Sequence, residues 1–252
     1  MIDVIIPAIK SDLGMLGKCI EGLRRFVSDG VNNIYLVAPK DEEIKAFCNA
    51  NRLVYVDEKE FMGFSKDDFS IGNDKRNGWL YQQLIKLNSD KLATTDNFLV
   101  FDADHVLIQP HTFFDGKNYH FYVSEEFHEP YFNAIGKLFG GKYHKLIDKS
   151  FISDKMMFNK EILANMKKEI EEINNEPWID AIIKSYDQES FCGFSEFETY
   201  GTYFISNRPH PCIIHLDKRH MCMFKIIDKM SVDVMRDIYR RFMSITKYKE
   251  AK

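Results

Sequence analysis

Hydrophobic and polar positions along the first hundred residues alternate between two periods. Short apolar runs at residues 2–7, 34–38, 53–56 and 97–101 have the length and composition of buried strands. Between them, residues 13–27, 41–49 and 79–92 place apolar side chains at three- and four-residue spacing, which predicts helices with one buried face. Ser11-Asp12 is expected to cap the first helix and Gly30 to end it. Strands that alternate with helices predict an α/β fold with a largely parallel sheet covered on both faces.

The second half of the chain is less regular. Residues 120–124, 151–158 and 212–216 have strand patterns, and residues 160–173, 178–190 and 195–203 have helical ones. Residues 231–246 form a predicted amphipathic helix, whereas residues 61–77 lack a period and are expected to form a loop. The sequence shows no repeat, low-complexity tract or linker, so a single domain over residues 1–252 is expected.

Composition narrows the class of protein. A formal net charge of −4 over 252 residues gives no nucleic-acid footprint. No apolar run approaches the ~18 residues that a membrane span needs, and the N-terminus has the pattern of a strand and not of a signal peptide. Five cysteines without a C-x-x-C pair fit a reduced chain without a disulfide framework. We therefore expect a cytoplasmic protein.

An acidic pair stands at the end of the strand predicted at residues 97–101. On an extended chain, side chains two residues apart point the same way, so Asp102 and Asp104 can converge on one cation. Mg²⁺ and Mn²⁺ prefer such oxygen ligands and bridge them to substrate phosphates. An acidic pair of this kind is more often a solvated turn. A second apolar run at residues 106–108, however, predicts another strand, and two uncompensated charges between buried strands are costly. The pattern thus favours a metal-binding D-x-D site.

In this arrangement the chain resembles the GT-A fold glycosyltransferases. More specifically it resembles the DUF6492 type, a group of bacterial and viral GT-A-like proteins associated with polysaccharide synthesis. Residues 7–27 are similar to the family's first strand, loop and helix. Residues 78–87 match its G-W-x-x-Q-Q-L-x-K-L helix, residues 101–104 its metal motif, and residues 195–201 its S-E-x-x-x-Y-G segment. Where a histidine is expected before the apolar run in the middle of such proteins, this chain has Asp154-Lys155.

The resemblance implies a GT-A, Rossmann-like domain with a mixed, mostly parallel central sheet flanked by helices. Residues 1–104 would form the nucleotide-sugar-binding half, and residues 105–252 the acceptor side and a C-terminal helix. It implies a metal-dependent glycosyltransferase that uses Mn²⁺ or Mg²⁺. The donor would be a nucleoside-diphosphate sugar such as a UDP-sugar, and the acceptor a glycan or a lipid-linked glycan in surface polysaccharide synthesis.

Several polar residues are candidate contacts to the donor. A diphosphate carries more charge than one divalent cation neutralises, so a nearby basic group is expected. Adjacent glutamines on a helix cannot share a face, so one of the pair is expected near the donor sugar. Each candidate also has a structural explanation, as a surface charge, a solvated amide or a side chain that fills the core. The candidates are Lys10, Asp12, Lys75, Arg76, Trp79, Gln82, Gln83 and Asp102.

The segment around residue 215 carries a further candidate. In many GT-A enzymes a C-terminal strand delivers a histidine to the D-x-D metal and a lysine to the phosphates, and His215 and Lys218 resemble that pair. The alternatives are a core histidine at a strand end and a zinc site. For zinc, the spacing of His210, His215 and His220 around two cysteines does not fit the common ligand patterns.

Glu196 and Glu198 are the catalytic candidates. On a helix they lie about 200° apart, so only one can face the site. Ser195 is expected to cap this helix, with Glu198 completing a capping box. That structural role leaves Glu196 as the expected general base, and an inverting reaction needs such a base.

Two other functions stay open from the sequence. A sugar-1-phosphate nucleotidylyltransferase needs a glycine-rich basic loop after the first strand, and residues 8–12 contain no glycine. A non-catalytic nucleotide-sugar-binding module would differ by hydrolysing no donor. The basic residues of the C-terminal helix, among them Arg236 and Arg240, either form a solvated face or contact an anionic membrane surface.

Overall fold

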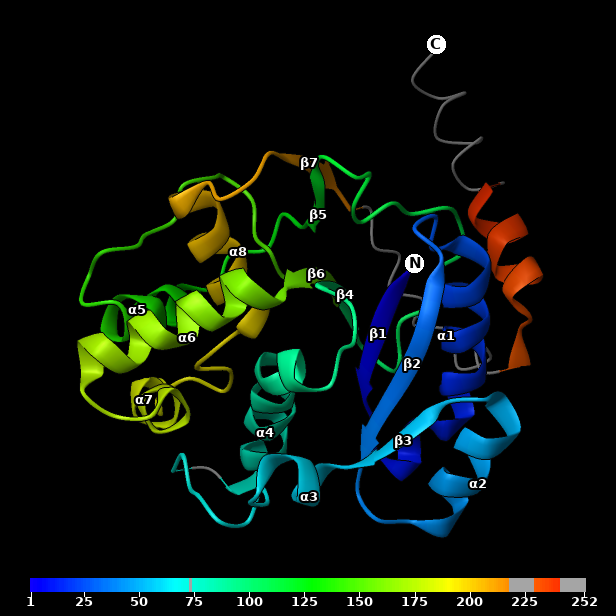
Figure 1. The fold of residues 1–252 in the computed structure, drawn as a ribbon, viewed down its shortest axis with the longest axis horizontal. Coiled ribbons are helices and arrows are strands. Elements are labelled where there is room, and N and C mark those ends of the chain that lie inside the picture. The colour runs from blue at the N-terminus through cyan, green and yellow to red at the C-terminus, as the bar shows by residue number, and fades with distance from the viewer. Residues whose placement is uncertain (73, 218–228, 241–252) are drawn as a thin grey trace.

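A five-stranded sheet forms the centre of the molecule (Figure 1). The structure is a computed structural model that describes residues 1–72, 74–217 and 229–240, without the side chains of residues 74 and 75. Four strands run parallel in the order β3-β2-β1-β4, and β6 pairs antiparallel with β4 at the edge. Their bounds are β1 (Ile2–Pro7), β2 (Val31–Ala38), β3 (Val54–Asp57), β4 (Asn97–Phe101) and β6 (Lys155–Asn159). The predicted mixed, mostly parallel sheet is confirmed.

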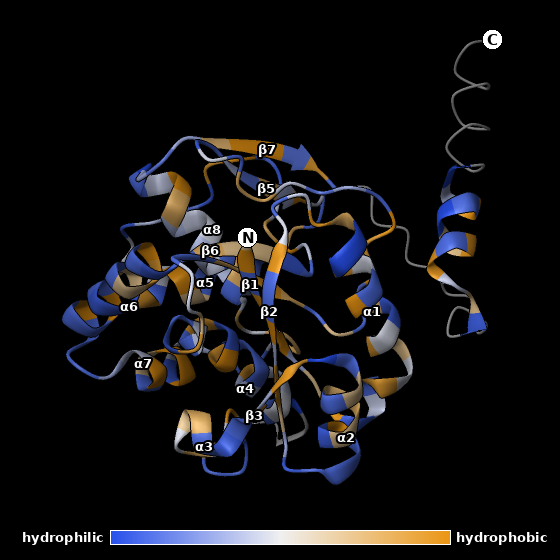
Figure 2. Ribbon diagram, turned by 45° about the vertical axis from the view of Figure 1, so that its right-hand side comes forward, coloured by the Kyte–Doolittle hydropathy of each residue, from blue (hydrophilic) through white to orange (hydrophobic). Residues whose placement is uncertain are grey.

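Helices cover both faces of this sheet (Figure 1). On one side lie α1 (Leu13–Phe26) and α2 (Glu42–Asn51), and on the other lie α4 (Asp74–Asn88), α6 (Lys160–Asn174) and α8 (Glu196–Asn207). Because both faces are covered, every residue of β1 is buried, as is β4 from Phe98 onward. Hydrophobic residues lie along the strands and on one side of each helix, as the colours of Figure 2 show. This arrangement is the one that the two hydrophobic periods of the sequence predicted.

The helix that connects β1 to β2 differs from the prediction in how it begins and ends. A short 3-10 helix, η1 (Lys10–Asp12), precedes α1, and Asp12 makes no side-chain cap bond to α1. Its carboxylate accepts a hydrogen bond from the Ile9 amide at 2.8 Å instead, so the predicted cap is wrong. The helix ends at Phe26, and Gly30, with φ of 75°, forms the turn into β2.

Residues 106–108 do not form the predicted strand; they are irregular. The backbone of Leu107 packs against Gly22 of α1, where an added Cβ would come within 2.7 Å of the Leu107 carbonyl oxygen. Leu107 is 1% exposed. The apolar run is therefore buried against a helix and does not extend the sheet.

Several helical segments are absent from the prediction or have other bounds than predicted. Helix α3 (Glu58–Met62) is only five residues long, and α4 begins at Asp74, inside the segment expected to be a loop. Helix α5 (Glu129–Leu138) buries Tyr131, Ala134, Ile135 and Leu138. That spacing is helical and was present in the sequence. The short helix η2 (Ser89–Lys91) follows α4, and α7 is confined to Trp178–Ser185.

The remaining strands form a separate two-stranded parallel sheet, made of β5 (Tyr119–Val123) and β7 (Cys212–Leu216). A helix over residues 232–240 follows and packs beside α1, where Asp233 pairs with Arg25 at 2.6 Å and Val232 is fully buried. The part of the predicted terminal helix beyond residue 240 lies outside the described residues. Within the described chain, no helix has the length and apolar character needed to cross a membrane.

Candidate active site

The order of the strands reverses at β1. Residues following β1 return to β2 on one side, whereas β4 pairs with β1 on the other side. In open α/β sheets, ligands bind beyond the carboxyl ends of the strands where the order reverses in this way. Asp102 follows β4 directly, at that end of the sheet. The acidic pair therefore stands where the topology by itself places a ligand.

The chain at the acidic pair is turned, not extended. The His105 amide donates to the Asp102 carbonyl oxygen at 3.2 Å and closes a turn, while the Asp102 amide donates to the Asp154 carbonyl oxygen at 2.9 Å. The same-side argument for an extended chain is therefore wrong in its geometry. Asp104 is exposed. The pKa of the buried Cys19 thiol is raised mainly by burial, and the charges of Asp102 and Asp104 raise it further. Both carboxylates thus lie near one buried position on α1.

A buried lysine joins two carboxylates at this site. Lys86 of α4 places its Nζ 2.5 Å from Asp102 Oδ1 and 2.6 Å from Glu196 Oε1, and its side chain is 4% exposed. Glu196 is the first residue of α8, so three elements far apart in the sequence meet here. We call Lys86, Asp102 and Glu196 the Lys86 cluster. The negative charge at the acidic pair, for which the sequence showed no partner, is therefore partly neutralised by the Lys86 ammonium.

The pKa shifts in the Lys86 cluster follow from burial and charge. Burial lowers the pKa of Lys86, but Asp102 and Glu196 outweigh it, so the pKa of Lys86 is raised. Burial raises the pKa of Asp102; Lys86 opposes this rise, while Glu196 and Asp104 add to it, and the net pKa is raised. The Lys86 ammonium also lies 4.4 Å from the centre of the Phe197 ring, a further favourable contact for a cation.

Of the two adjacent glutamines, Gln83 reaches this cluster. Its Oε1 accepts a hydrogen bond from the Glu196 amide at 3.1 Å, and the side chain is buried. Its Nε2 has no hydrogen-bond partner among the described residues. A buried donor without a partner is costly, and a ligand oxygen would satisfy it. Gln82 is half-buried, and its expected role at the donor stays a prediction, as does that of Gln83.

Arg76 and Trp79 lie on the same helix, toward its N-terminus. The Arg76 guanidinium packs over the Trp79 ring at 4.5 Å and the Phe191 ring at 3.9 Å. Its Nε donates to the Phe191 carbonyl oxygen at 2.8 Å. Trp79 also contacts Tyr186 edge-on. Arg76 therefore joins α4 to the loop before α8, and the donor-binding role expected for both residues stays a prediction.

Glu198 has a different environment from Glu196. Its Oε2 accepts hydrogen bonds from the Ser150 hydroxyl at 2.5 Å and the Phe151 amide at 3.0 Å. Ser195 caps α8, as predicted, by accepting from the Glu198 amide at 3.2 Å. The predicted capping box is incomplete, because the Glu198 carboxylate is bound to the loop at Ser150 and does not return to the Ser195 amide. Burial raises the pKa of Glu198, opposed by these two hydrogen bonds.

Of the two charged candidates in the first loop, Lys10 is exposed and Asp12 is half-buried. Lys10 pairs with Glu43 at 2.7 Å and with Asp41 at 3.6 Å, and Asp12 holds the Ile9 amide. Neither contact tests the donor-binding roles expected for these two residues. Lys218 and the Lys75 side chain lie outside the described residues.

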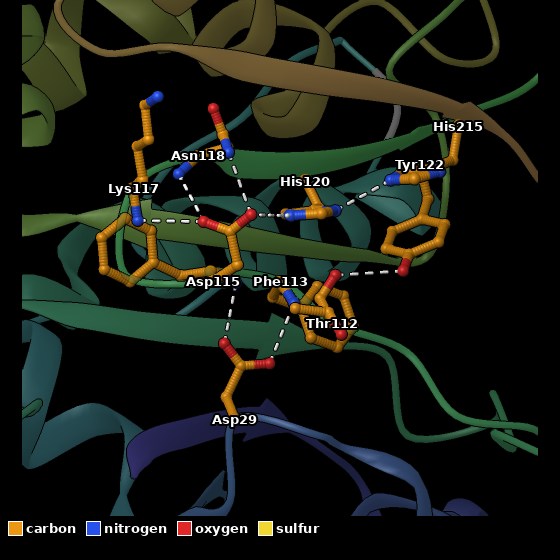
Figure 3. A network of polar contacts seen from close by, with 10 residues as sticks. Asp29, Thr112, Phe113, Asp115, Lys117, Asn118, His120, Tyr122 and His215 are labelled. Carbon is orange, nitrogen blue, oxygen red and sulfur yellow. Dashed lines mark hydrogen bonds and ion pairs between the residues drawn. The ribbon is translucent and has the colours of Figure 1, made fainter.

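His215 lies in the two-stranded sheet and contacts another histidine. Its Nε2 is 2.9 Å from Nδ1 of His120, whose Nε2 lies 3.2 Å from Asp115 Oδ2 (Figure 3). Burial and the neighbouring His120 lower the pKa of His215. Asp217, two residues on, pairs with the buried Lys155, the first residue of β6. The role of His215 as a ligand to the D-x-D metal stays a prediction.

The described residues contain no group of three or more His, Cys, Asp or Glu side chains arranged to hold a metal. Of the residues considered for zinc, His210 stacks on Tyr119, and His220 and Cys222 lie outside the described part of the chain. Mg²⁺ is usually held by only one or two carboxylates together with substrate phosphates. The exposed Asp104 and the Asp102 side chain, 21% exposed, fit that kind of site.

Lys86 is a residue of this candidate site that sequence reasoning missed, although its helix was singled out. Arg76, Trp79, Gln83 and Lys86 follow one another at spacings of three and four residues, so they form one helical face. That face lies about 90° around the helix from the leucines at 80, 84 and 87, so the two faces are neighbours. A polar stripe on a helix that is otherwise buried was the available signal.

Fold and site together define an α/β protein with a cluster of charged side chains at the carboxyl end of β4, in a sheet whose strand order reverses at β1. The profile of one family, described as a family of unknown function (DUF6492), matches residues 2–233. The chain belongs to the DUF6492 family, as the resemblance in its motifs indicated. No curated protein matches.

Solved structures of glycosyltransferases overlap with much of the chain. Mouse xyloside xylosyltransferase 1 in its apo form is 12% identical, covers 85% of each chain and gives a TM-score of 0.45. Mannosyl-3-phosphoglycerate synthase from Rubrobacter xylanophilus is 11% identical, covers 98% of this chain and 75% of its own, and gives 0.45. Galactosyltransferase LgtC in complex with donor and acceptor sugar analogs is 14% identical, covers 73% and 70%, and gives 0.39.

Proposed function

We propose that the protein is a metal-dependent glycosyltransferase that moves a sugar from a nucleoside-diphosphate sugar, such as a UDP-sugar, to a hydroxyl acceptor. The observation that carries this proposal is the Lys86 cluster, in which Asp102, directly after β4, meets Glu196 of α8 through one buried lysine. Nucleotides are a ligand class that commonly binds at this end of such a sheet, where the strand order reverses. Asp102 is half-buried and Asp104 is exposed, and two such carboxylates fit a cation that is also bound by phosphate oxygens.

The residues divide the work of transfer between two sides. Asp102 and Asp104 would hold Mn²⁺ or Mg²⁺, which when bound offsets the negative charge of the departing diphosphate. The unpaired Gln83 Nε2 is available to a hydroxyl of the donor sugar. On the other side, Glu196 accepts the proton of the acceptor hydroxyl as its oxygen attacks the anomeric carbon. The bond from that carbon to the diphosphate oxygen breaks, and the product is inverted.

The acceptor and the place of reaction are also part of the proposal. We propose a glycan or lipid-linked glycan acceptor in surface polysaccharide synthesis, on the cytoplasmic side of the membrane. The described cysteines, which are Cys19, Cys48, Cys192 and Cys212, are free thiols, and this supports a reducing compartment. The two halves, residues 1–104 and 105–252, correspond in this proposal to the donor side and the acceptor side.

A panel of nucleotide sugars tests the proposal. Thermal unfolding of the purified protein would be followed with each nucleotide sugar, with and without Mn²⁺. We expect one nucleotide class to raise Tm only when Mn²⁺ is present, because ligands that bind the native state stabilise it. No shift with any nucleotide sugar, or an equal shift without metal, contradicts the proposal.

Two alternatives give different results in a second assay. A non-catalytic binding module would bind the same donor but would not hydrolyse it during long incubation without acceptor, whereas a transferase slowly transfers the sugar to water. A sugar-1-phosphate nucleotidylyltransferase would instead release pyrophosphate from a nucleoside triphosphate. The segment after β1, Ala8-Ile9-Lys10-Ser11-Asp12, contains no glycine-rich phosphate loop, which argues against that activity.

A further inference from the structure

One cation serves two acidic groups in the Lys86 cluster. Lys86 Nζ contacts Asp102 at 2.5 Å and Glu196 at 2.6 Å, so the cluster has two carboxylates for one ammonium. Asp104 lies in the same turn, two residues after Asp102, and its side chain is exposed. When all these groups are charged, the site keeps an excess of negative charge. It therefore attracts a further cation, although Lys86 already lies beside both Asp102 and Glu196.

Lys86 is fixed in this position. Its side chain is 4% exposed, and its ammonium lies over the Phe197 ring at 4.4 Å. Glu196, in turn, is held through its backbone amide by Gln83, one turn before Lys86 on α4. A divalent cation on Asp102 would lie within a few ångströms of the ammonium, and charges of like sign at that separation repel each other strongly in a partly buried site.

We propose that Lys86 is the internal counter-ion of the site: a positioning residue that competes with the divalent cation for Asp102 and keeps Glu196 in place beside it. This inference rests on the proposed function, because it assigns the cation to Asp102. When a divalent cation engages Asp102, Lys86 retains its contact with Glu196. Glu196, on the acceptor side, thereby stays in place while the Lys86 ammonium beside Asp102 is replaced by the divalent cation.

Replacement of Lys86 tests this inference directly. In Lys86→Met the competing charge is gone, and Asp102 and Glu196 repel each other, so Mn²⁺ alone should bind at least about tenfold more tightly than to the wild type. Turnover should fall, because Glu196 has lost the group that positions it. Lys86→Arg keeps the charge and should leave Mn²⁺ affinity within about threefold.

Lys167→Met is the matched control. Lys167 is also a buried lysine paired with one aspartate, Asp90 at 2.6 Å, and packed over an aromatic ring, that of Trp178, but it lies outside the site. Its replacement should not change Mn²⁺ affinity. If Lys86→Met does not fold, the double variant Lys86→Met/Glu196→Gln removes the pair together. It should then bind Mn²⁺ more tightly than Glu196→Gln does.

Calorimetry with MnCl₂ alone, and then with UDP added, separates the two claims. If Lys86→Met binds Mn²⁺ as tightly as the wild type does, or more weakly, the proposed role of Lys86 is wrong. The proposed function is not affected by that result. If only Lys86→Met binds Mn²⁺, the role of Lys86 is supported and the metal dependence of the wild type fails. If neither binds Mn²⁺ with or without UDP, both claims fail.

Discussion

At the residue scale, the two aspartates of the acidic turn have different surroundings. Asp102 is held by Lys86, whereas Asp104 is exposed and makes little contribution to packing. We expect Asp104→Ala to lose Mn²⁺-dependent binding of UDP without loss of stability, because an exposed carboxylate is removed and the fold keeps its core. Calorimetry and thermal unfolding measure the two effects. Undiminished metal-dependent binding by the variant would remove the central claim.

His215 should matter less than Asp104 for metal-dependent binding. Its Nε2 is already engaged by His120, so ligation through that nitrogen would require the histidine pair to separate. We expect His215→Ala to weaken Mn²⁺-dependent UDP binding by less than Asp104→Ala does, in the same calorimetric titration. His120→Ala is the control for loss of the pair. A loss in His215→Ala as complete as that in Asp104→Ala contradicts this order.

Glu196 and Glu198 allow a matched pair of variants on one helix turn. We expect Glu196→Gln to lose turnover by roughly a hundredfold or more while it keeps donor affinity, because general-base catalysis typically contributes 10²–10⁴-fold. Glu198→Gln should keep turnover, since its carboxylate binds Ser150 and Phe151 and not the Lys86 cluster. Product analysis by NMR gives the anomeric configuration. Near-normal turnover in Glu196→Gln, or a product with the donor's configuration, refutes the assignment of the base.

At the scale of the element, close packing of α8 depends on one glycine. A Cβ at Gly201 would lie 2.2 Å from the Phe151 ring, which is itself buried. We expect Gly201→Ala to destabilise the protein by about 1–3 kcal/mol or more, because an overpacked core must shift. Urea unfolding measures this change.

Gly17 of α1 is the control for the same substitution. It lies in a helix, and an added Cβ would meet nothing within 4 Å. Gly17→Ala should therefore stabilise the protein by roughly 0.5–1 kcal/mol, the difference in helix propensity. If the two variants change stability equally, the contact between α8 and Phe151 is not the cause.

At the scale of the whole molecule, one buried aspartate joins three segments. Asp3 of β1 accepts hydrogen bonds from Asn32 and Asn33 at the start of β2 and from Thr94 before β4. Burial raises the pKa of Asp3, but the hydrogen bonds outweigh it, and its net pKa is lowered. The contribution of this carboxylate to stability is therefore complete above its unfolded pKa and is lost as the pH falls through its folded pKa.

Asp3→Asn tests this connection. At neutral pH we expect a loss of roughly 1–3 kcal/mol in the free energy of unfolding, because charge-assisted hydrogen bonds are lost. The difference from the wild type should shrink below about pH 4, where the wild-type carboxylate begins to be protonated in the unfolded chain. Urea unfolding across this range measures it. A difference that does not change with pH excludes the ionised carboxylate as its cause.

The sequence by itself determined most strands of the central sheet and the coverage of both its faces by helices. Strands at residues 2–7 and 97–101 begin and end as predicted, because a run of apolar residues is a local property of the chain. The strand at residues 212–216 also has the predicted bounds, but it lies in the two-stranded sheet and three of its apolar side chains are exposed. The position of the acidic pair after β4 followed from the same pattern. The cap by Ser195 was also readable, since capping depends on neighbours within one turn.

Only the tertiary structure decided what the charges at the site contact. Lys86 is 16 residues before Asp102 and 110 before Glu196, and no local rule relates three groups so far apart. The Asp102 amide likewise bonds to the distant Asp154 carbonyl oxygen, and the Leu107 backbone can lie against α1 because Gly22 has no side chain there. Periodicity tells which residues are buried. Packing between distant elements decides which buried charges meet, and here it placed a lysine between the two carboxylates.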